Sequence, residues 1–406
     1  MKAMKTVGCA YGGPADDPQR IDFVAIASEV TKFPLHDGLL KELPGLKHLS
    51  RLHLGWSGVT DAGLKHIANM QTITELELES TRVTDAGIRE LKQMKGLVTL
   101  NLVNTQITDA GLKDLCELPH LSSLKLRGPG VTEDGLKQLA GANSLRHLTY
   151  FPLTDRVLKN LQEIGKLSAL QIVSGNDPAN IESLDLGSSQ VTPAGVQQLQ
   201  LTNLKHLKLK STPTTDAQLE HLRDFRELQS LDLTLTPVSS AGMKHLRGLK
   251  NLQSLTLTGT NVDGAGLQDL IDLPNLRALQ LGRCPISDAD LAVLPKFPRL
   301  EEVSFQKSNI TDAGMKWLKQ CRGLKVVRLT QLDITDAGLQ ELADLPELHE
   351  LVLGVTKATT AGFKPFQQSQ SLKSVIIFGG EFKNNAIGGV QQLLPDVTVQ
   401  SWFSRR

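Results

Sequence analysis

The segment from Leu97 to Leu118 reads LVTLNLVNTQITDAGLKDLCEL, and this pattern decides the fold. Its first six residues have the apolar and polar alternation of a short strand with one buried face. Thr108 then precedes the sequence Asp-Ala-Gly-Leu. A Thr at this place is typical of a helix N-cap, because its hydroxyl accepts a free amide of the first turn. The segment therefore predicts one strand followed by one short helix.

The same pattern recurs at a fixed spacing along most of the chain. We call its first aliphatic residue the anchor, and anchors follow one another every 24 residues in two blocks: Leu49, Ile73, Leu97, Leu121 and Leu145, then Leu204, Leu228, Leu252, Leu276, Leu300, Leu324, Leu348 and Leu372. A fixed period of this length is typical of stacked supersecondary units, which bury their apolar faces against one another. We predict an α/β solenoid, a horseshoe with parallel strands on the concave face and short helices on the convex face.

Three further positions recur within the units. Eleven residues after the anchor stands a capping residue, usually Thr, followed in most units by Asp, whose charge suits the helix dipole. Gly stands three residues after the cap, as at Gly87 and Gly111, which predicts that a neighbouring element approaches closely. The residue eight after the anchor is usually Thr, Ser or Cys, which predicts buried hydroxyls bonded to backbone groups of the next turn.

These motifs carry a family resemblance. The string V/I-T-D-A-G-L following L-x-x-L-x-L-x-x-T resembles the leucine-rich repeat superfamily, most closely its bacterial 24-residue class, which is similar to the ribonuclease-inhibitor-like repeats. The resemblance covers residues 45–394. It implies the horseshoe fold and binding of other macromolecules through the concave face or its rim.

The spacing also predicts the domain organisation. Anchors at Leu167 and Ile181 break the period between the two regular blocks. We expect a flexible N-terminal segment at 1–20, an N-terminal capping unit at 21–48, the leucine-rich repeat solenoid at 49–394 with irregular units at 150–181, and a C-terminal cap or tail at 395–406. In that tail, Trp402 and Phe403 are expected to plug the end of the core, since repeat arrays need terminal caps.

Composition excludes several classes of protein. The 406 residues include 44 Lys and Arg against 43 Asp and Glu, so a strongly basic nucleic-acid binder is disfavoured. The 4 cysteines are too scattered for a disulfide framework or a metal site. No apolar run is long enough to span a membrane, and the N-terminal segment lacks the apolar stretch of a signal peptide. We therefore expect a cytoplasmic protein, with export after removal of a signal peptide as the alternative.

The search for chemistry finds no catalytic, cofactor-binding or metal-binding constellation. The histidines fall at scattered repeat positions, and no His-x-x-x-His pair, nucleophile elbow or phosphate loop is present. The sequence therefore predicts a monomeric, non-enzymatic scaffold without cofactor that binds a protein or peptide, and no nucleic acid. Two alternatives remain: a regulator of a partner enzyme, similar to the GTPase-activating members of the superfamily, or a structural cell-surface protein.

Charged side chains mark a first candidate surface on the concave face. Positions two, four and six after an anchor face solvent on an alternating strand. In one unit these are Glu75, Glu77 and Glu79, an acidic stripe. Asp185, Lys208 and Asp232 occupy one slot in three successive units, which predicts a charge ladder between parallel neighbours.

Two other features are candidates for partner binding. The irregular segment contains a turn-rich loop with Asn176 and Asp177, beside Phe151, which is either a rim binding loop or a tolerated insertion. Apolar residues stand where solvent-facing ones are expected, and they are either a partner site or covered by the C-terminal tail: Val326, Val352, Val355, Ile376 and Phe378. Trp56 is a further candidate contact.

Overall fold

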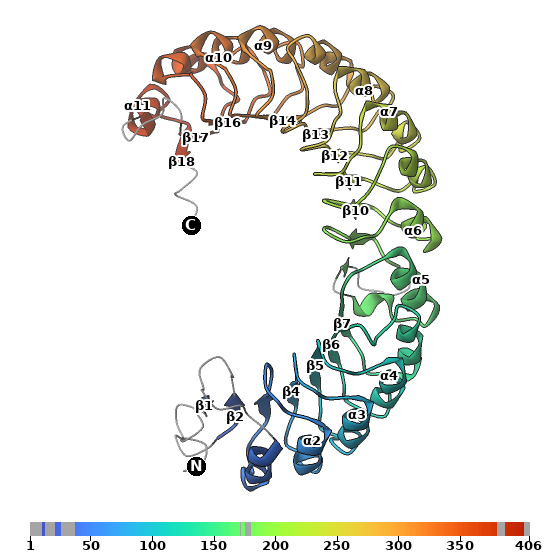
Figure 1. Cartoon of the computed structure of the whole chain (residues 1–406). Coiled ribbons are helices and arrows are strands. Elements are labelled where there is room, and N and C mark those ends of the chain that lie inside the picture. Colours follow the sequence, from blue (N-terminus) through green and yellow to red (C-terminus); the bar gives the residue numbers. More distant parts are fainter. Residues whose placement is uncertain are drawn as a thin grey trace. The chain divides into compact units, whose positions relative to one another are not determined.

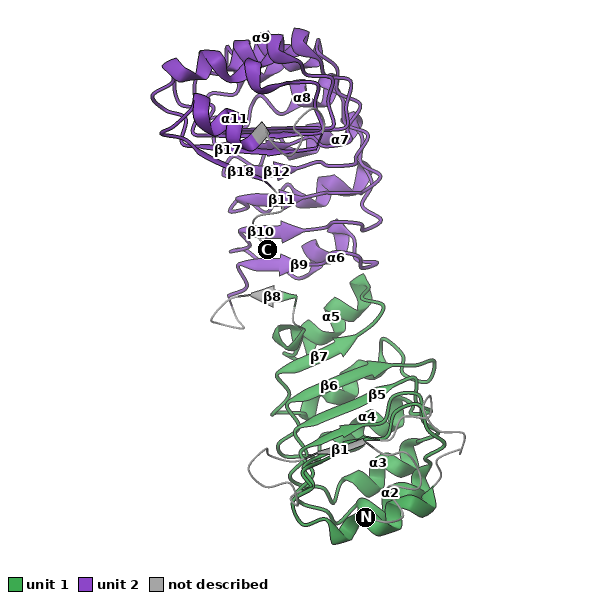
Figure 2. Cartoon of the chain, turned by 90° about the vertical axis from the view of Figure 1, so that its left-hand side faces the viewer, with its two compact units in different colours: residues 1–174 green, residues 175–406 purple. Residues whose placement is uncertain are grey.

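The computed structural model describes residues 10–12, 21–25, 37–170, 172–174, 180–379 and 386–401. The chain forms two compact units, Met1–Ser174 and Gly175–Arg406, which we call unit 1 and unit 2 (Figure 2). The predicted contacts Asn176 and Asp177 and the predicted plug Trp402 and Phe403 lie outside the described residues.

Unit 1 is built from strand–helix repeats in chain order. Its strands are β1 (Ala10–Gly12), β2 (Phe23–Ala25), β3 (Arg51–His53), β4 (Glu75–Glu77), β5 (Thr99–Val103), β6 (Ser123–Arg127), β7 (His147–Tyr150) and β8 (Val173–Ser174). Its α- and 3-10 (η) helices are η1 (Asp37–Gly45), α2 (Asp61–Ile67), α3 (Asp85–Leu91), α4 (Asp109–Leu115), η2 (Gly135–Gly141), α5 (Asp155–Glu163) and η3 (Leu167–Ala169). β1 and β2 are antiparallel, and β2 to β7 pair in parallel, each with the next.

Unit 2 repeats the same architecture. Its strands are β9 (Ser183–Asp185), β10 (His206–Lys208), β11 (Ser230–Asp232), β12 (Ser254–Thr256), β13 (Ala278–Gln280), β14 (Glu302–Gln306), β15 (Val326–Thr330), β16 (Glu350–Gly354), β17 (Ser374–Phe378) and β18 (Thr398–Ser401). Its helices are α6 (Pro193–Gln198), η4 (Ala217–Leu222), α7 (Ser240–Met243), η5 (Lys244–Leu246), α8 (Gly264–Asp269), η6 (Asp290–Lys296), α9 (Asp312–Leu318), α10 (Asp336–Leu342), η7 (Thr360–Gln368) and α11 (Ala386–Leu393). In each unit the strands line the inner side of the curve and the helices its outer side (Figure 1).

The strand register reproduces the sequence period. Leu231 lies opposite Leu207 on one side and Leu255 on the other, so residues 24 apart are neighbours. These three side chains are at most 1% exposed, and the equivalent residues of the other turns form one continuous apolar core in each unit. The predicted α/β solenoid is confirmed. Several of its helices, such as η2, η4 and η6, are 3-10 rather than α.

In most turns where Asp follows the cap, that Asp joins consecutive turns. Thr84 accepts a hydrogen bond from the Ala86 amide at its hydroxyl, as predicted for a cap. Its own amide and hydroxyl donate to the two carboxylate oxygens of Asp61 in the preceding turn, at 2.8 and 2.6 Å. The same pair of bonds recurs in other turns: Asp85 to Thr108, Asp109 to Thr132, Asp216 to Ser239, Asp288 to Thr311, Asp312 to Thr335 and Asp336 to Thr359. The Asp therefore does more than complement the helix dipole.

This bond between turns also explains the recurring glycine. A Cβ on Gly87 would lie 2.4 Å from the Asp61 Oδ1 atom, and a Cβ on Gly111 would lie 2.4 Å from the Asp85 Oδ1 atom. The predicted close approach is therefore to a carboxylate of the preceding turn. The helix accepts Gly, at a cost of about 1 kcal/mol relative to Ala, because the carboxylate occupies the space a methyl group needs.

The buried hydroxyls bond differently from the prediction. Thr105 is 4% exposed and its hydroxyl donates to the Leu102 carbonyl at 2.8 Å, three residues earlier in the same turn. The same bond recurs at other turns: Ser57, Thr81, Thr212, Thr236 and Thr260. The prediction of bonds to the next turn is wrong for these residues, because the chain turns back sharply after the strand and brings its own carbonyl within reach.

Candidate functional site

The chain reverses direction just beyond each strand, and this point defines a rim. The residue seven after the anchor has a positive φ in nearly every regular turn: Trp56, Ser80, Asn104, Ser188, Ser211, Leu235, Gly259, Arg283, Lys307, Gln331, Val355 and Gly379, with φ between 48° and 72°. We call the residues six and seven after each anchor the strand-end rim. Its row of left-handed residues was not predicted, because the position is rarely glycine.

Hydrogen bonding between turns imposes this conformation. The amide of Leu235 donates to the Thr258 carbonyl at 2.8 Å, and the amide of Val355 donates to the Phe378 carbonyl at 2.8 Å. Equivalent bonds join the rim residues of the other turns, so the ladder between turns continues past the strands. A left-handed residue other than glycine costs about 1–2 kcal/mol. The rim therefore stores backbone strain, which is typical of functional surfaces.

Single exposed apolar side chains stand on this strained rim in each unit. The large hydrophobic residues that are most exposed are Trp56 at 57%, Phe151 at 51%, Leu235 at 50% and Val355 at 46%. Phe151 stands six residues after its anchor and the other three stand seven after theirs. A β-branched residue such as Val355 is especially unusual at positive φ. Exposure and strain at the same positions mark the rim as the candidate binding surface.

Leu235 was not among the predicted contacts, although Trp56, Phe151 and Val355 were. The signal that identifies it is an apolar residue at the seventh place after an anchor, where Ser, Asn or Gly also occurs. This place lies beyond the end of the strand, so the alternation of the strand does not predict whether its side chain is exposed.

The acidic stripe of unit 1 is a hydrogen-bonded network beside Trp56. Glu75 accepts from the His53 ring at 2.8 Å, and Glu77 contacts the Lys125 ammonium at 3.6 Å. Asn101, only 3% exposed, donates to both Glu77 and Glu79. The three carboxylates are half-buried, so the stripe is satisfied largely by its own neighbours.

Phe151 has a cationic neighbour on the same rim. The Arg127 guanidinium lies 5.1 Å from the centroid of the Phe151 ring, within the range of a cation–π interaction. This contact fixes the ring at the rim while half of its surface remains exposed.

The apolar patch predicted on the concave face of unit 2 is only partly exposed. Val352 is 2% and Ile376 3% exposed, so of the two predicted alternatives an open partner site is wrong for these two residues. Val326 and Phe378 are half-buried, and Val355 alone is open. Long side chains of neighbouring residues crowd Val352 and Ile376. The alternation of apolar and polar residues within one strand does not predict these neighbours.

Three neighbours produce this crowding. Arg328 lies opposite Val352 in the register and reaches both Glu302 and Glu350. The Phe378 ring lies across Gly354, where a Cβ would be 2.2 Å from the ring Cζ atom. β18 extends the sheet on the other side and places Gln400 opposite Ile376.

The predicted charge ladder is present in part. The Lys208 ammonium lies 2.9 Å from an Asp185 carboxylate oxygen, and this pairing raises the pKa of Lys208 above its usual value. Asp232 instead accepts from the amide and hydroxyl of Thr234 in its own turn.

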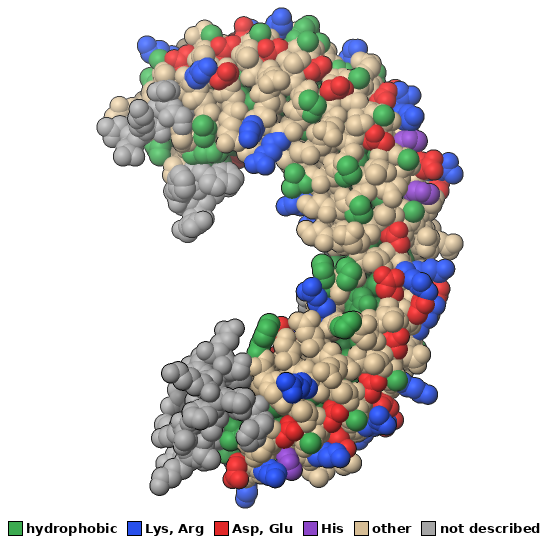
Figure 3. All heavy atoms as spheres, in the orientation of Figure 1, with side chains coloured by type: hydrophobic (Ala, Val, Ile, Leu, Met, Phe, Trp, Pro, Cys, Tyr) green, Lys and Arg blue, Asp and Glu red, His purple; other side chains and the backbone are tan. Residues whose placement is uncertain are grey.

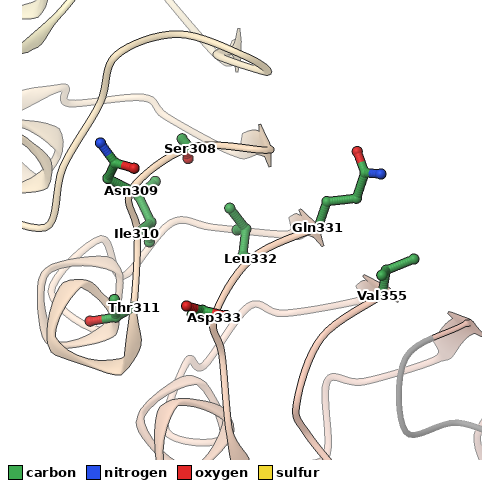
Figure 4. Close-up of a pocket in the computed structure, with 8 residues that line it drawn as sticks. All are labelled: Ser308, Asn309, Ile310, Thr311, Gln331, Leu332, Asp333 and Val355. Atoms are coloured by element: carbon green, nitrogen blue, oxygen red, sulfur yellow. The ribbon is translucent and has the colours of Figure 1, made fainter.

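A hollow of about 500 Å³ lies beside the rim near Val355. Its lining is Ser308, Asn309, Ile310, Thr311, Gln331, Leu332, Asp333 and Val355 (Figure 4). Leu332 takes the place that Thr or Ser holds in other turns, between Ser308 and Thr356 in the flanking turns. The hydroxyls of those two residues are buried without a hydrogen-bond partner among the described residues. The hydroxyl pattern is therefore interrupted at the rim hollow.

Two of the cysteines are buried in the core. Burial raises the pKa of Cys321 to about 12 and also raises the pKa of Cys284, so both thiols remain neutral and unreactive. No three His, Cys, Asp or Glu side chains of the described residues are placed to hold a metal ion. No helix in the same part of the chain is long and apolar enough to cross a membrane.

Comparisons with known proteins agree with this architecture. The model of a "Leucine-rich repeat region" family matches residues 129–403, and that of a "Leucine Rich repeat" family matches 45–68, 69–92 and 97–116. No curated protein matches the chain.

Several solved structures are similar. An internalin (inlF) from Listeria monocytogenes is 18% identical with a TM-score of 0.39, over 87% of this chain and 85% of that one. Internalin C2 (inlC2) of the same organism is 25% identical with a TM-score of 0.40, over 49% and 80%. A leucine-rich repeat protein of Leptospira interrogans is 20% identical with a TM-score of 0.38, over 87% and 90%. Because the first family model covers more than half of the residues, this chain belongs to the leucine-rich repeat family.

Proposed function

We propose that this protein is a non-enzymatic scaffold that binds a protein or peptide through its strand-end rim and the concave face beside it. The observation that carries the proposal is the position of Trp56, Phe151, Leu235 and Val355, which are about half exposed and all lie on the rim. A partner that covers exposed apolar side chains removes them from water, and this burial favours binding.

Backbone strain supports the same surface. Glycine would relieve the left-handed conformation at Trp56, Leu235 and Val355, yet a large apolar side chain stands at each. The side chains contribute little to folding because they are half exposed. A role in partner contact accounts for their presence at a conformation that disfavours them.

Membership of the family supports the class of function. Leucine-rich repeat proteins generally act as scaffolds for protein interaction. The fold alone does not determine the partner, so the proposal rests on the rim residues.

Site-specific photocrosslinking tests the proposal. A benzophenone amino acid is placed at position 56, 151, 235 or 355, and as a control at Gln320, which is exposed after α9 on the helical side. In extract of the cells that produce the protein, we expect rim positions of either unit to crosslink a protein that position 320 does not capture. Crosslinks from position 320 alone would assign binding to the helical side and overturn the proposal.

A further inference from the structure

We infer that the rim of unit 2 from Leu235 to Val355 docks an acidic segment of the protein partner, whose carboxylates meet Arg283 and Lys307 between two apolar contacts. This inference rests on the proposed function and adds the chemistry of the partner.

The register makes this part of the rim a continuous strip. Amides of consecutive rim residues donate to carbonyls of the next turn: Leu235 to Thr258, Gly259 to Gly282, Arg283 to Gln306, Lys307 to Thr330, Gln331 to Gly354 and Val355 to Phe378. Neighbouring strands of a sheet lie about 4.8 Å apart, so five intervals span about 24 Å. The order of side chains along the strip is apolar, glycine, two cations, amide, apolar.

The two cations are unpaired on a surface where most are paired. Arg328 reaches Glu302 and Glu350, Lys208 reaches Asp185, and Lys325 reaches Glu301. Arg283 and Lys307 are exposed, and no carboxylate of the described residues forms an ion pair with either.

The surrounding rim positions also lack an acidic side chain, and Asp333 of the neighbouring hollow is paired with the Lys357 ammonium at 3.0 Å. The positions six and seven after the anchors from Ile181 to Leu372 contain Lys210, Arg283 and Lys307 and no Asp or Glu. On the face seen in Figure 3, blue side chains stand on the inner edge of unit 2, whereas blue and red ones are mixed over its helices. The chain has a net charge of only +1, so this local excess is a property of the rim and not of the whole surface. Complementary charge favours an acidic partner.

The side chains at the two ends of the strip indicate which residues the docked segment has at its own ends. Leu235 and Val355 offer apolar contact on either side of the cations, and the hollow beside Val355 has an apolar floor of Ile310 and Leu332, which are 0% and 4% exposed. In Figure 4, Gln331 and Val355 project from successive strand ends at the edge of this hollow. An extended chain advances about 3.3 Å per residue, so about eight residues match the strip. The segment that fits has acidic residues in its centre and apolar residues at its ends.

The observations favour a protein segment over a nucleic acid. A nucleic acid needs a field of cations along its phosphates, whereas this strip has two central cations flanked by apolar side chains.

A designed peptide tests the inference on the full chain. The probe is a fluorescent eight-residue peptide with four central Glu and two Leu at each end, and its control replaces each Glu by Gln. Anisotropy titration should show saturable binding of the Glu peptide that weakens with salt, and at least tenfold weaker binding of the Gln peptide. The Arg283→Gln/Lys307→Gln variant should bind the Glu peptide about tenfold more weakly, as expected for two exposed ion pairs.

A matched variant controls for net charge. Arg322→Gln/Lys364→Gln removes two exposed cations from the helical side of unit 2 and should leave peptide binding unchanged. Equal binding of the Glu and Gln peptides, no saturable binding, equal loss in both variants, or displacement by a single-stranded oligonucleotide would each overturn the inference. If these results occur while positions 235 and 355 still crosslink a partner, the proposed function stands and only the acidic character of the partner is rejected.

Discussion

At the residue scale, a Thr such as Thr84, which caps a helix, makes two kinds of hydrogen bond. Its hydroxyl accepts an amide of its own helix, and its amide and hydroxyl donate to the Asp of the preceding turn. One Thr-Asp-Ala-Gly string therefore provides the cap, the carboxylate for the following turn and the glycine that leaves room for the preceding carboxylate. The recurrence of this string is a consequence of bonding between turns as much as of helix formation.

Replacing one cap should show the value of both bonds. Thr108→Ala removes the acceptor for the Ala110 amide and the hydroxyl donor to Asp85, so we expect the free energy of unfolding to fall by about 1–2 kcal/mol. Thr108→Ser keeps both groups and should lose less. Thr99→Ala, on the half-buried strand face, is the control and should cost little. Urea denaturation measures the three values, and an equal loss at positions 99 and 108 would contradict the cap assignment.

Relief of backbone strain on the rim should raise stability. Val355→Gly removes a β-branched side chain from φ 53°, and we expect the free energy of unfolding to rise by up to about 1 kcal/mol while partner binding weakens. The reverse change, Gly259→Ala, should destabilise the protein, because φ is 72° and the new Cβ would lie 2.6 Å from the Leu235 Cδ2 atom. Thermal melting compares both variants with the unchanged protein. A lower melting temperature for Val355→Gly would mean that its side chain is needed for folding.

At the element scale, β16 and β17 pack against each other through Gly354 and Phe378. The Phe378 ring occupies the space above Gly354, so the two strands pack closely on the concave side. This contact explains why an aromatic residue at the end of β17 is half-buried although its place in the alternation faces solvent. The adjoining Val352 and Ile376 are buried on the same face.

A double-mutant cycle should reveal this coupling. Gly354→Ala should lower the free energy of unfolding by about 1–3 kcal/mol, because the methyl group and the ring compete for one space. Phe378→Ala should also destabilise the protein by loss of packing. The double variant should lose less than the sum of the two, since removal of the ring makes room for the methyl group. Additive losses in urea denaturation would show that the ring and Gly354 are independent.

At the scale of the whole molecule, the sequence predicts the architecture better than the surface. The 24-residue period of Leu anchors is sufficient to predict the stacked strands, because each anchor must pack against its equivalent in the next turn. Val352 lies opposite Arg328 and Ile376 lies opposite Gln400, and alternation within one strand does not show these neighbours from other turns. The left-handed backbone of the rim was not predicted, for a related reason. Hydrogen bonds between turns impose the positive φ, and glycine, which would mark such a position in the sequence, is mostly absent there.

The boundary between the two compact units should be the first internal site of proteolysis. Regular turns are protected because hydrogen bonds to the next turn hold strands and rim alike. The boundary falls between Ser174 and Gly175, where the following residues are Asn, Asp and Pro, a composition typical of protease-accessible loops. Brief digestion with a protease of broad specificity should therefore give two fragments that meet near residue 175, identified by mass spectrometry. Earlier cleavage within the regular turns from Leu204 to Leu372 would contradict this prediction, since it would place the weakest segment inside the repeat array.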